Sequence, residues 1–511
     1  MTRAPVRWRD FRPGSHVLRV AGLAAALACA AHFGSAAGSP GSSREEVSKC
    51  RVAGLPVEPG DMVRRVPPEQ NAAPLYLLWM QWKRQRRFAS ADQPDPAKLA
   101  NPRERTAELV RIGRVLQMHK AELDLIHRAV ARRHCYFEKD WSLGPAVLFP
   151  ELAEMRGMAR WLIGSSELLL SRGQPVAAAR EAALGFRIAG HCLETPAMLH
   201  ALTAAAIDRM ALKQLESIVL RADRGDVRST VRHALAAARM PSVSDMLRGE
   251  PLMAFQAGKL LDMPDAKVRQ LLGITGKPEA GQSVALGAIR GLMGDPDITP
   301  QDVERVRQLA TKPGFSIKSL RREKIPFVLP VDAYEPARTD AAAHRRWVDA
   351  NTALALSVTR RVAVAARRST DAALDACYEA GDEVAQRTRQ TVFAHPASGG
   401  LRPADTVLAS ILLTNLCGTL LKRPPDYTTA RAALLLAATR VLDYRAANGR
   451  FPNRLQDALP KPPMDPFVGR PVKYRPMDRG FTLWCVGRTG TYDGVRDAKN
   501  EAVLRYAPAM P

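Results

Sequence analysis

The feature that most constrains the fold is an apolar periodicity of about three to four residues, broken by helix stop and start signals. Between residues 151 and 171, one side of a helix carries Leu152, Met155, Ala159, Leu162 and Leu169. The next four residues are Arg172-Gly173-Gln174-Pro175, in which the glycine ends one helix and the proline opens another. The apolar period then resumes between residues 176 and 193. This pattern predicts two helices joined by a tight turn, as in an antiparallel helical hairpin.

The same periodicity recurs along much of the chain. It predicts further helices at residues 101–130, 195–218, 228–238, 341–368, 370–390 and 404–421. The first begins with Asn101 as N-cap and Pro102 at the first helical position, and its apolar face suits one helix of about seven to eight turns. The hairpin at 151–193 resembles those of tetratricopeptide-type repeats, although self-similarity at their period is missing. We therefore predict a mainly α fold of antiparallel helical hairpins, tetratricopeptide-like in part.

A chain of 511 residues is too long for one hydrophobic core, so we expect several domains. Composition divides it into a targeting segment or anchor at 1–37, a linker and short helix at 38–95, a helical-hairpin domain at 96–240, a loop-rich helical region at 241–340, a helical region at 341–425 and a C-terminal module at 426–511. Residues 38–70 are polar and aperiodic, which predicts a linker. Residues 75–82 are apolar and aromatic. We expect them to form a helix that packs on the body, with a surface anchor as the alternative.

Residues 1–37 have the three parts of a secretory signal peptide. Arginines form a positive start, an apolar stretch covers residues 20–31, and small residues follow at 34–37. Two triplets, Ala28-Cys29-Ala30 and Ser35-Ala36-Ala37, offer small residues at the −3 and −1 positions of a cleavage site. Three alternatives stay open: retention as a membrane anchor, lipidation at Cys29, and a mitochondrial transit peptide. We expect an extracytoplasmic protein, periplasmic or held to the membrane through its N-terminus.

The seven cysteines are widely spaced, and removal of Cys29 with the leader leaves six. An exported chain permits disulfides, but the sequence contains no C-x-x-C pair. The spacing therefore favours neither zinc nor redox chemistry. We expect most of these cysteines to be buried free thiols.

The formal net charge of +24 raises the question of an acidic partner. A nucleic-acid-binding chain gathers its basic residues on one face and interleaves them with aromatic side chains. Here the arginines are spread over every segment, often one helical turn from an acidic residue, and only 6% of the residues are aromatic. Nucleic acid is therefore not the expected partner. An anionic membrane surface is the other acidic partner that such a charge suits.

The most specific pattern lies near the C-terminus. A helix at 427–448 is expected to stop at Gly449, and residues 465–469 (Asp-Pro-Phe-Val-Gly) lead into two strands joined by a turn at 478–480. The alternating apolar residues of these strands are Val472, Tyr474, Phe481, Leu483 and Cys485. The module is thus a small α+β unit of a helix and an antiparallel hairpin, and we expect Phe451 and Leu455 to cover its sheet.

In this order the elements resemble the C-terminal part of the major pseudopilins of type II secretion. They resemble even more a group of uncharacterised bacterial exported proteins that join such a module to a helical body. The shared elements are Tyr-Arg-x-x-x-Gly-Arg-Phe-Pro from 444, Asp-Pro-Phe-x-Gly-x-Pro-Val-x-Tyr from 465 and Gly-Phe-x-Leu-Trp-Cys-Val-Gly from 480, within about one sixth of the chain. The resemblance implies an extracytoplasmic module. A pseudopilin begins with a leader and a long apolar helix, whereas this module starts far along the chain, so we do not expect it to polymerise in the pilin manner.

The resemblance also bears on metal binding, because major pseudopilins hold calcium in a loop after their last strands. The matching loop here is 487–497, and Thr489 stands where that family usually has aspartate. Asp493 and Asp497 are the candidate calcium ligands. Calcium takes about six to eight oxygen ligands, so the alternative is that both aspartates lie in a solvated turn. No other cofactor is expected.

The sequence contains none of the common catalytic fingerprints of metalloproteases, serine hydrolases or nucleotide-binding enzymes. Its clustered histidines are His119, His127, His134, His191 and His200. Their spacing does not suit a metal site, and we expect partly buried packing residues. Arg248 and Glu250 lie in a stretch that resembles the helical region of the same bacterial group. They are our candidate functional residues, with a turn held by a local ion pair as the alternative.

These observations favour an exported, non-catalytic helical scaffold or protein-interaction protein of the bacterial envelope, linked to secretion by its C-terminal module. We expect a protein partner, because helical hairpins offer a concave binding surface. Two alternatives stay open. One is an envelope hydrolase with an unrecognised site, and the other is a basic protein that binds an anionic polymer or lipid headgroups.

Overall fold

The computed structural model describes residues 42–85, 93–95, 98–99, 101–272, 284–285, 289, 340–393, 406–422, 426–487 and 502–506. These residues are mainly helical with a small antiparallel sheet, which confirms the predicted mainly α class. They divide into two compact units. Unit 1 comprises the described residues within Met1–Met62, Lys139–Val147 and Leu247–Pro424, and unit 2 comprises those within Val63–Glu138, Leu148–Met246 and Pro425–Pro511. None of the helices in the described segments has the length and apolar character of a transmembrane span.

Unit 1 is organised around the long helix α17 (Ala341–Ala365), which is capped by the Asp340 side chain. It packs against α2 (Ser43–Val52), α12 (Glu250–Asp262), α18 (Thr370–Phe393) and α19 (Val407–Lys422). The close approach of α12 requires Gly258, because a Cβ atom there would lie 2.1 Å from Thr352 Oγ1 of α17. The shorter elements of this unit are η2 (Pro59–Met62), η5 (Trp141–Ala146) and α13 (Asp265–Leu272).

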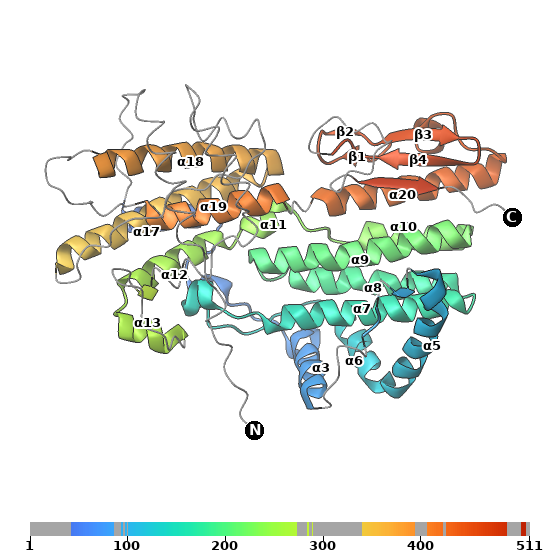
Figure 1. Ribbon diagram of the computed structural model, residues 1–511, viewed down its shortest axis with the longest axis horizontal. Coiled ribbons are helices and arrows are strands. Elements are labelled where there is room, and N and C mark those ends of the chain that lie inside the picture. The colour runs from blue at the N-terminus through green and yellow to red at the C-terminus, as the bar shows by residue number, and fades with distance from the viewer. Residues whose placement is uncertain are drawn as a thin grey trace. The chain divides into compact units, whose positions relative to one another are not determined.

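Unit 2 contains the predicted helical hairpin. Helix α7 (Pro150–Ser171) ends before Gly173, whose φ is +72°, and α8 (Pro175–Cys192) begins at Pro175. Because glycine adopts positive φ without a Cβ clash, the predicted stop signal is confirmed. Helices α9 (Met198–Ala222) and α10 (Gly225–Ala237) extend the layer, and Figure 1 draws α7 to α10 side by side. The unit also holds η3 (Pro68–Gln70), α3 (Ala73–Gln85), α5 (Pro102–Met118) and α6 (Lys120–Val130), and α11 (Val243–Leu247) ends at its boundary.

The C-terminal part of unit 2 combines two helices with five short strands. The elements are α20 (Asp426–Asn448), α21 (Leu455–Ala458), β1 (Met464–Asp465), β2 (Arg470–Pro471), β3 (Lys473–Met477), β4 (Gly480–Trp484) and β5 (Val503–Tyr506). Strands β1 and β2 pair antiparallel, and β4 lies between β3 and β5 in an antiparallel sheet. Met477 pairs with Gly480, so the predicted turn is present with Asp478 and Arg479 as its loop. The stop at Gly449 is confirmed by a φ of +71°.

One hydrophobic core joins the helices and the sheet of unit 2. Its members come from α8, α9, α10, α20 and the strands, and include Ala179, Leu215, Val231, Leu434, Phe481, Leu483, Leu504 and Tyr506. Phe451 and Leu455 join it as predicted, and the Phe451 ring lies edge-on to Phe481 with a centroid separation of 5.6 Å. Since these groups are buried against one another, the sheet and the helices exclude water from a common interior.

The single helix predicted at 101–130 is wrong, because the chain breaks at His119 between α5 and α6. His119 has φ −116° and ψ 33°, outside the helical range. Its ring meets the Trp82 ring of α3 edge-on, with 5.0 Å between centroids. The sequence has no glycine or proline at this point, so the break reflects a tertiary contact that periodicity does not register.

The linker predicted at 38–70 is wrong for residues 43–52, which form α2. The Ser42 hydroxyl accepts a hydrogen bond from the Glu45 backbone and begins the helix. Val47 and Cys50 are buried, and Glu46 accepts hydrogen bonds from the Arg360 side chain of α17 at 3.1 and 3.2 Å. Few residues of α2 are apolar, so its burial against a distant helix was not visible in the local composition.

Two further comparisons complete the account of the predicted elements. The sheet has a third strand, β5, which the predicted hairpin lacked. All six described cysteines are buried free thiols, in agreement with the expectation. The targeting segment at 1–37 with Cys29, most of the region at 241–340, and Asp493 and Asp497 lie outside the described residues.

Candidate functional site

Histidine–glutamate pairs are the recurrent polar feature of unit 2. The four pairs are His119–Glu122 at 3.9 Å, His127–Glu181 at 3.1 Å, His134–Glu194 at 3.3 Å and His200–Glu151 at 3.7 Å. A carboxylate beside an imidazole orients the ring and favours its protonated form. Sequence reasoning predicted packing histidines and did not find the acidic partners.

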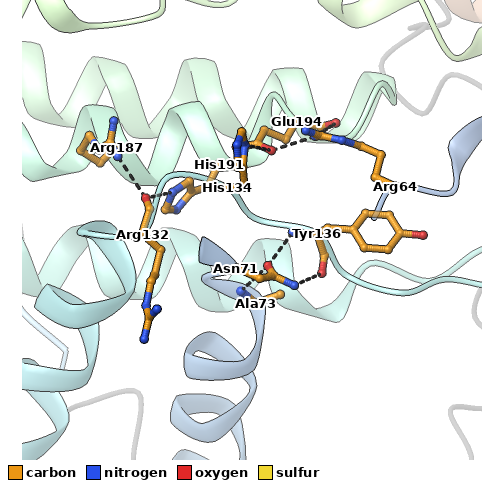
Figure 2. Close-up of polar contacts among 9 residues, drawn as sticks. All are labelled: Arg64, Asn71, Ala73, Arg132, His134, Tyr136, Arg187, His191 and Glu194. Atoms are coloured by element: carbon orange, nitrogen blue, oxygen red, sulfur yellow. Dashed lines mark hydrogen bonds and ion pairs between the residues drawn. The ribbon is translucent and has the colours of Figure 1, made fainter. Parts of the chain in front are cut away.

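Asn71 fixes the start of α3 against the segment that follows α6 (Figure 2). Its side-chain oxygen accepts hydrogen bonds from Ala73 N at 3.1 Å and Tyr136 N at 2.9 Å, while its amide nitrogen donates to Tyr136 O at 3.1 Å. The Ala72 backbone also donates to His134 O over 2.7 Å. One asparagine therefore satisfies the open end of a helix and an extended segment together.

His191 of α8 lies buried beside this junction. Its Nε2 atom faces Arg132 O at 3.1 Å and its Nδ1 atom faces the Tyr76 hydroxyl at 2.8 Å. A carbonyl oxygen only accepts, so Nε2 carries the proton and Nδ1 accepts from Tyr76. Burial lowers the pKa of His191 to about 4, so the ring is neutral near pH 7. His191 and Tyr76 thus connect α8 and α3 through neutral hydrogen bonds.

The rim of the junction carries a partly exposed charged cluster. Glu194 Oε2 accepts from Arg64 Nη1 at 2.8 Å and lies 3.3 Å from His134 Nδ1, as Figure 2 shows. Arg187 meanwhile donates to Val130 O and Arg132 O, which ties the end of α6 to α8. The His134 and Glu194 side chains are 31% and 12% exposed, so this contact lies at the edge of the junction.

A second, buried group begins at the N-terminal ends of α7 and α9. Glu151 lies in the first turn of α7 and His200 in the first turn of α9, with 3.7 Å between Oε1 and Nε2. The Phe149 ring stands edge-on to His200 at 4.7 Å between centroids. Both side chains are at most 3% exposed. An acid–base pair is therefore held in a nearly dry environment.

Asp208 of α9 belongs to the same buried region. It is fully buried, and neither carboxyl oxygen has a hydrogen-bond partner among the described residues. Burial raises the pKa of Asp208 well above its usual value. Burial also raises the pKa of the Cys192 thiol, helped by the charges of Asp208 and Glu151, which places these groups near one another.

The chemistry open to this region is proton donation and acceptance. Cys192 and Cys135 are buried with pKa values raised by desolvation, so neither supplies a thiolate nucleophile. Over the described segments, no three His, Cys, Asp or Glu side chains gather as metal ligands do. Asp208 supplies a carboxyl group whose pKa is raised by burial, and His200 and Glu151 form an imidazole–carboxylate pair. Together they have the residue types of a general acid–base site.

The structure places the predicted functional residues elsewhere. Arg248 is exposed just after α11, whereas Glu250 is buried at the first position of α12, and both belong to unit 1. Glu151, His200 and Asp208 belong to unit 2. Asp493 and Asp497 are outside the described residues, so the calcium prediction stays a prediction.

Asp208 was missed although the sequence carries a signal for it. It follows Ala204 and Ala205 and precedes Ala211 and Leu212 at helical spacing, all of which are buried. An acid on the apolar stripe of a helix is a departure from the amphipathic pattern. Such a residue is a candidate for a special role, because burying an unpaired carboxyl costs free energy.

No protein-family model matches this chain, and comparison with curated proteins and with solved structures also gives no match.

Proposed function

We propose that the chain is an exported, non-catalytic helical scaffold of the bacterial envelope, built from tetratricopeptide-like hairpins and a C-terminal module of pseudopilin type. The observation that carries the proposal is the common core of unit 2, in which α8, α9 and α10 bury the same interior as α20 and the sheet. Because the module shares this core with α8, α9 and α10, its sheet is held at a fixed position on the helical layer. A protein partner from the secretion apparatus or another envelope assembly binds that composite surface.

The experiment that tests this proposal is expression in a Gram-negative host, followed by fractionation and intact mass measurement. The expected result is periplasmic recovery with residues 1–30 or 1–37 removed. Cross-linking in intact cells, from photoreactive residues placed at exposed Arg475 and Arg479 of the module, is expected to trap one envelope protein. Full-length protein confined to the cytoplasm would contradict the proposal. Cross-linked products that are the same wherever the photoreactive residue is placed would also contradict it.

The buried acid–base group favours a second candidate, an envelope hydrolase. Its support is the juxtaposition of Glu151 and His200 and the uncompensated burial of Asp208, which resemble the perturbed groups of catalytic sites. The test is turnover of chromogenic ester, phosphate, glycoside and peptide substrates. Loss of one activity on His200→Gln and Asp208→Asn, with the fold intact by circular dichroism, would establish the hydrolase. An inactive wild-type protein, or variants as active as wild type, would contradict the hydrolase proposal.

A further inference from the structure

The C-terminal end of α3 and the corner between α5 and α6 form an exposed surface that is both apolar and basic. The α3 corner is defined as Leu77, Leu78, Arg84, Arg114, Met118 and Lys120, all of them exposed. Met118 is 68% exposed, and Leu77 and Leu78 are 51% and 50% exposed. Figure 1 draws the ends of these helices projecting together at the lower edge of unit 2. Exposed large apolar side chains usually occur singly on a protein surface. A group of them beside basic residues therefore indicates a binding surface.

One aromatic contact links the two parts of this surface. The Trp82 ring of α3 lies edge-on to His119, 5.0 Å away between centroids, and Met118 directly precedes His119. Leu78 lies one turn before Trp82 on the same face of α3, and Arg114 lies one turn before Met118 on α5. The Trp82–His119 contact therefore joins α3 to the corner between α5 and α6, and Arg84, Met118 and Lys120 lie within two residues of it in the sequence.

Helix α3 divides its two faces between different tasks. Its inner face buries Ala73, Leu75, Tyr76, Trp79 and Met80, whereas its outer face exposes Leu77, Leu78, Gln81 and Arg84. The helix contains no acidic residue. An outer face that combines leucines with a cation, Arg84, fits a helix that lies in a bilayer interface.

The acidic groups near this surface do not cancel its charge. Glu122 of α6 is only 15% exposed and faces His119. Lys83 Nζ forms an ion pair with Glu154 Oε2 at 2.8 Å, so Lys83 is not counted in the α3 corner. Asp124 is exposed on α6, one turn beyond Lys120. Among the described residues at this surface, three exposed cations therefore stand against one exposed carboxylate.

We propose that the α3 corner binds the surface of an anionic lipid bilayer. Leu78 and Met118 enter the headgroup region, while Arg84, Arg114 and Lys120 face lipid phosphates. A soluble polyanion would contact only the cations. The exposed apolar residues favour a bilayer as the partner, because a bilayer offers an apolar region below its charged headgroups. This inference does not depend on the scaffold proposal, since an enzyme or a scaffold could be held at a membrane in this way.

The test places a fluorophore on the proposed contact. The Met118→Cys variant, in a Cys29→Ser background, is labelled with an environment-sensitive dye. The other cysteines are buried. Leu148→Cys is the matched control, because Leu148 is 77% exposed and lies elsewhere in unit 2. With phosphatidylglycerol-containing vesicles, the dye at position 118 is expected to shift to the blue and the dye at position 148 to stay unchanged.

Three outcomes decide the proposal. The proposal is supported if only the dye at position 118 shifts and if Leu78→Asp lowers the affinity for vesicles about tenfold, because that substitution removes an apolar contact. Equal responses at positions 118 and 148 would overturn it, since binding would then not involve the α3 corner. A response to heparin that matches the response to vesicles would also overturn it, because charge alone would explain binding. The local readout separates this contact from any contribution of residues 1–41.

Discussion

Arg228 of α10 and Asp443 of α20 are 215 residues apart in the sequence, yet Arg228 Nε donates to Asp443 Oδ1 over 2.6 Å. Arg232 donates to the other oxygen of Asp443, also over 2.6 Å. Arg228 is buried, and its second contact is Asp223 Oδ1 at 2.8 Å. A buried arginine therefore depends on Asp443 for much of its charge balance, and this pair fastens the C-terminal helix to the helical layer.

Substitution of Asp443 by alanine should destabilise unit 2. The change leaves the buried Arg228 guanidinium with one acceptor fewer. Removing one partner of a buried ion pair costs about 3–5 kcal/mol, and because the Asp443 side chain is 31% exposed we expect a loss at the lower end of that range. Urea denaturation followed by circular dichroism measures the loss. The control is Asp226→Ala, which removes the fully exposed pair with Arg224 and should leave the midpoint unchanged. Equal midpoints for Asp443→Ala and wild type would refute the fastening role.

The helix ends of unit 2 could be predicted because their signals are local. Gly173, Pro175 and Gly449 act through their own backbone preferences, so the turn and the stops were recognisable from single residues. The break at His119 and the helix α2 were not predictable, because each depends on a side chain brought from elsewhere in the fold, Trp82 in one case and Arg360 in the other. Strand β5 depends in the same way on pairing with β4.

Asp208→Asn should stabilise unit 2 at neutral pH. In the folded chain the acid stays protonated far above pH 3.8, whereas in the unfolded chain it ionises at about 3.8. The unfolded state is therefore favoured, and the free energy of unfolding falls, as pH rises from about 3.8 towards the folded pKa. The variant lacks this titration, so it should be more stable than wild type at pH 7. Asparagine keeps the shape and removes the titration.

The pH dependence separates this cause from a change in packing. Denaturation of both proteins at a series of pH values from 4 to 8 should show a difference that grows with pH. Glu122→Gln serves as a control for a partly exposed carboxylate on the same unit. A variant that is less stable than wild type at every pH would show that Asp208 makes a favourable interaction, and the account of an uncompensated acid would fail.

His191 should make the protein sensitive to mild acid. Its pKa is about 4 when folded and 6.5 when unfolded, so the unfolded state binds more protons between these values. Stability is then lost as pH falls from 6.5 to 4, by about 3 kcal/mol from this group. His191→Gln keeps an acceptor and a donor and should remove that loss. The measurement is the free energy of unfolding at pH 7 and pH 4 in both proteins, and an equal decrease in the two would contradict the assignment.

The candidate site was less predictable than the fold. Its histidines were visible in the sequence, but apart from Glu122 beside His119 their acidic partners lie far along the chain, as with His127 of α6 and Glu181 of α8. Neutral His191 gave no sequence signal, because its tautomer depends on the Tyr76 hydroxyl and the Arg132 carbonyl. Asp208 alone carried a local signal, as an acid within an apolar helical stripe.

The His127–Glu181 pair should respond to pH in the opposite direction from His191. The hydrogen bond to Glu181 raises the pKa of His127 above 6.5, against the effect of burial. Its contribution is fully present below 6.5 and is lost as pH rises through the folded pKa. Because His127 is 35% exposed, we expect well under 1 kcal/mol. Histidine-selective NMR titration measures it directly. Glu181→Gln should lower the His127 midpoint and leave the exposed His233 resonances unaffected, and an unchanged His127 midpoint would show that the contact does not form in solution.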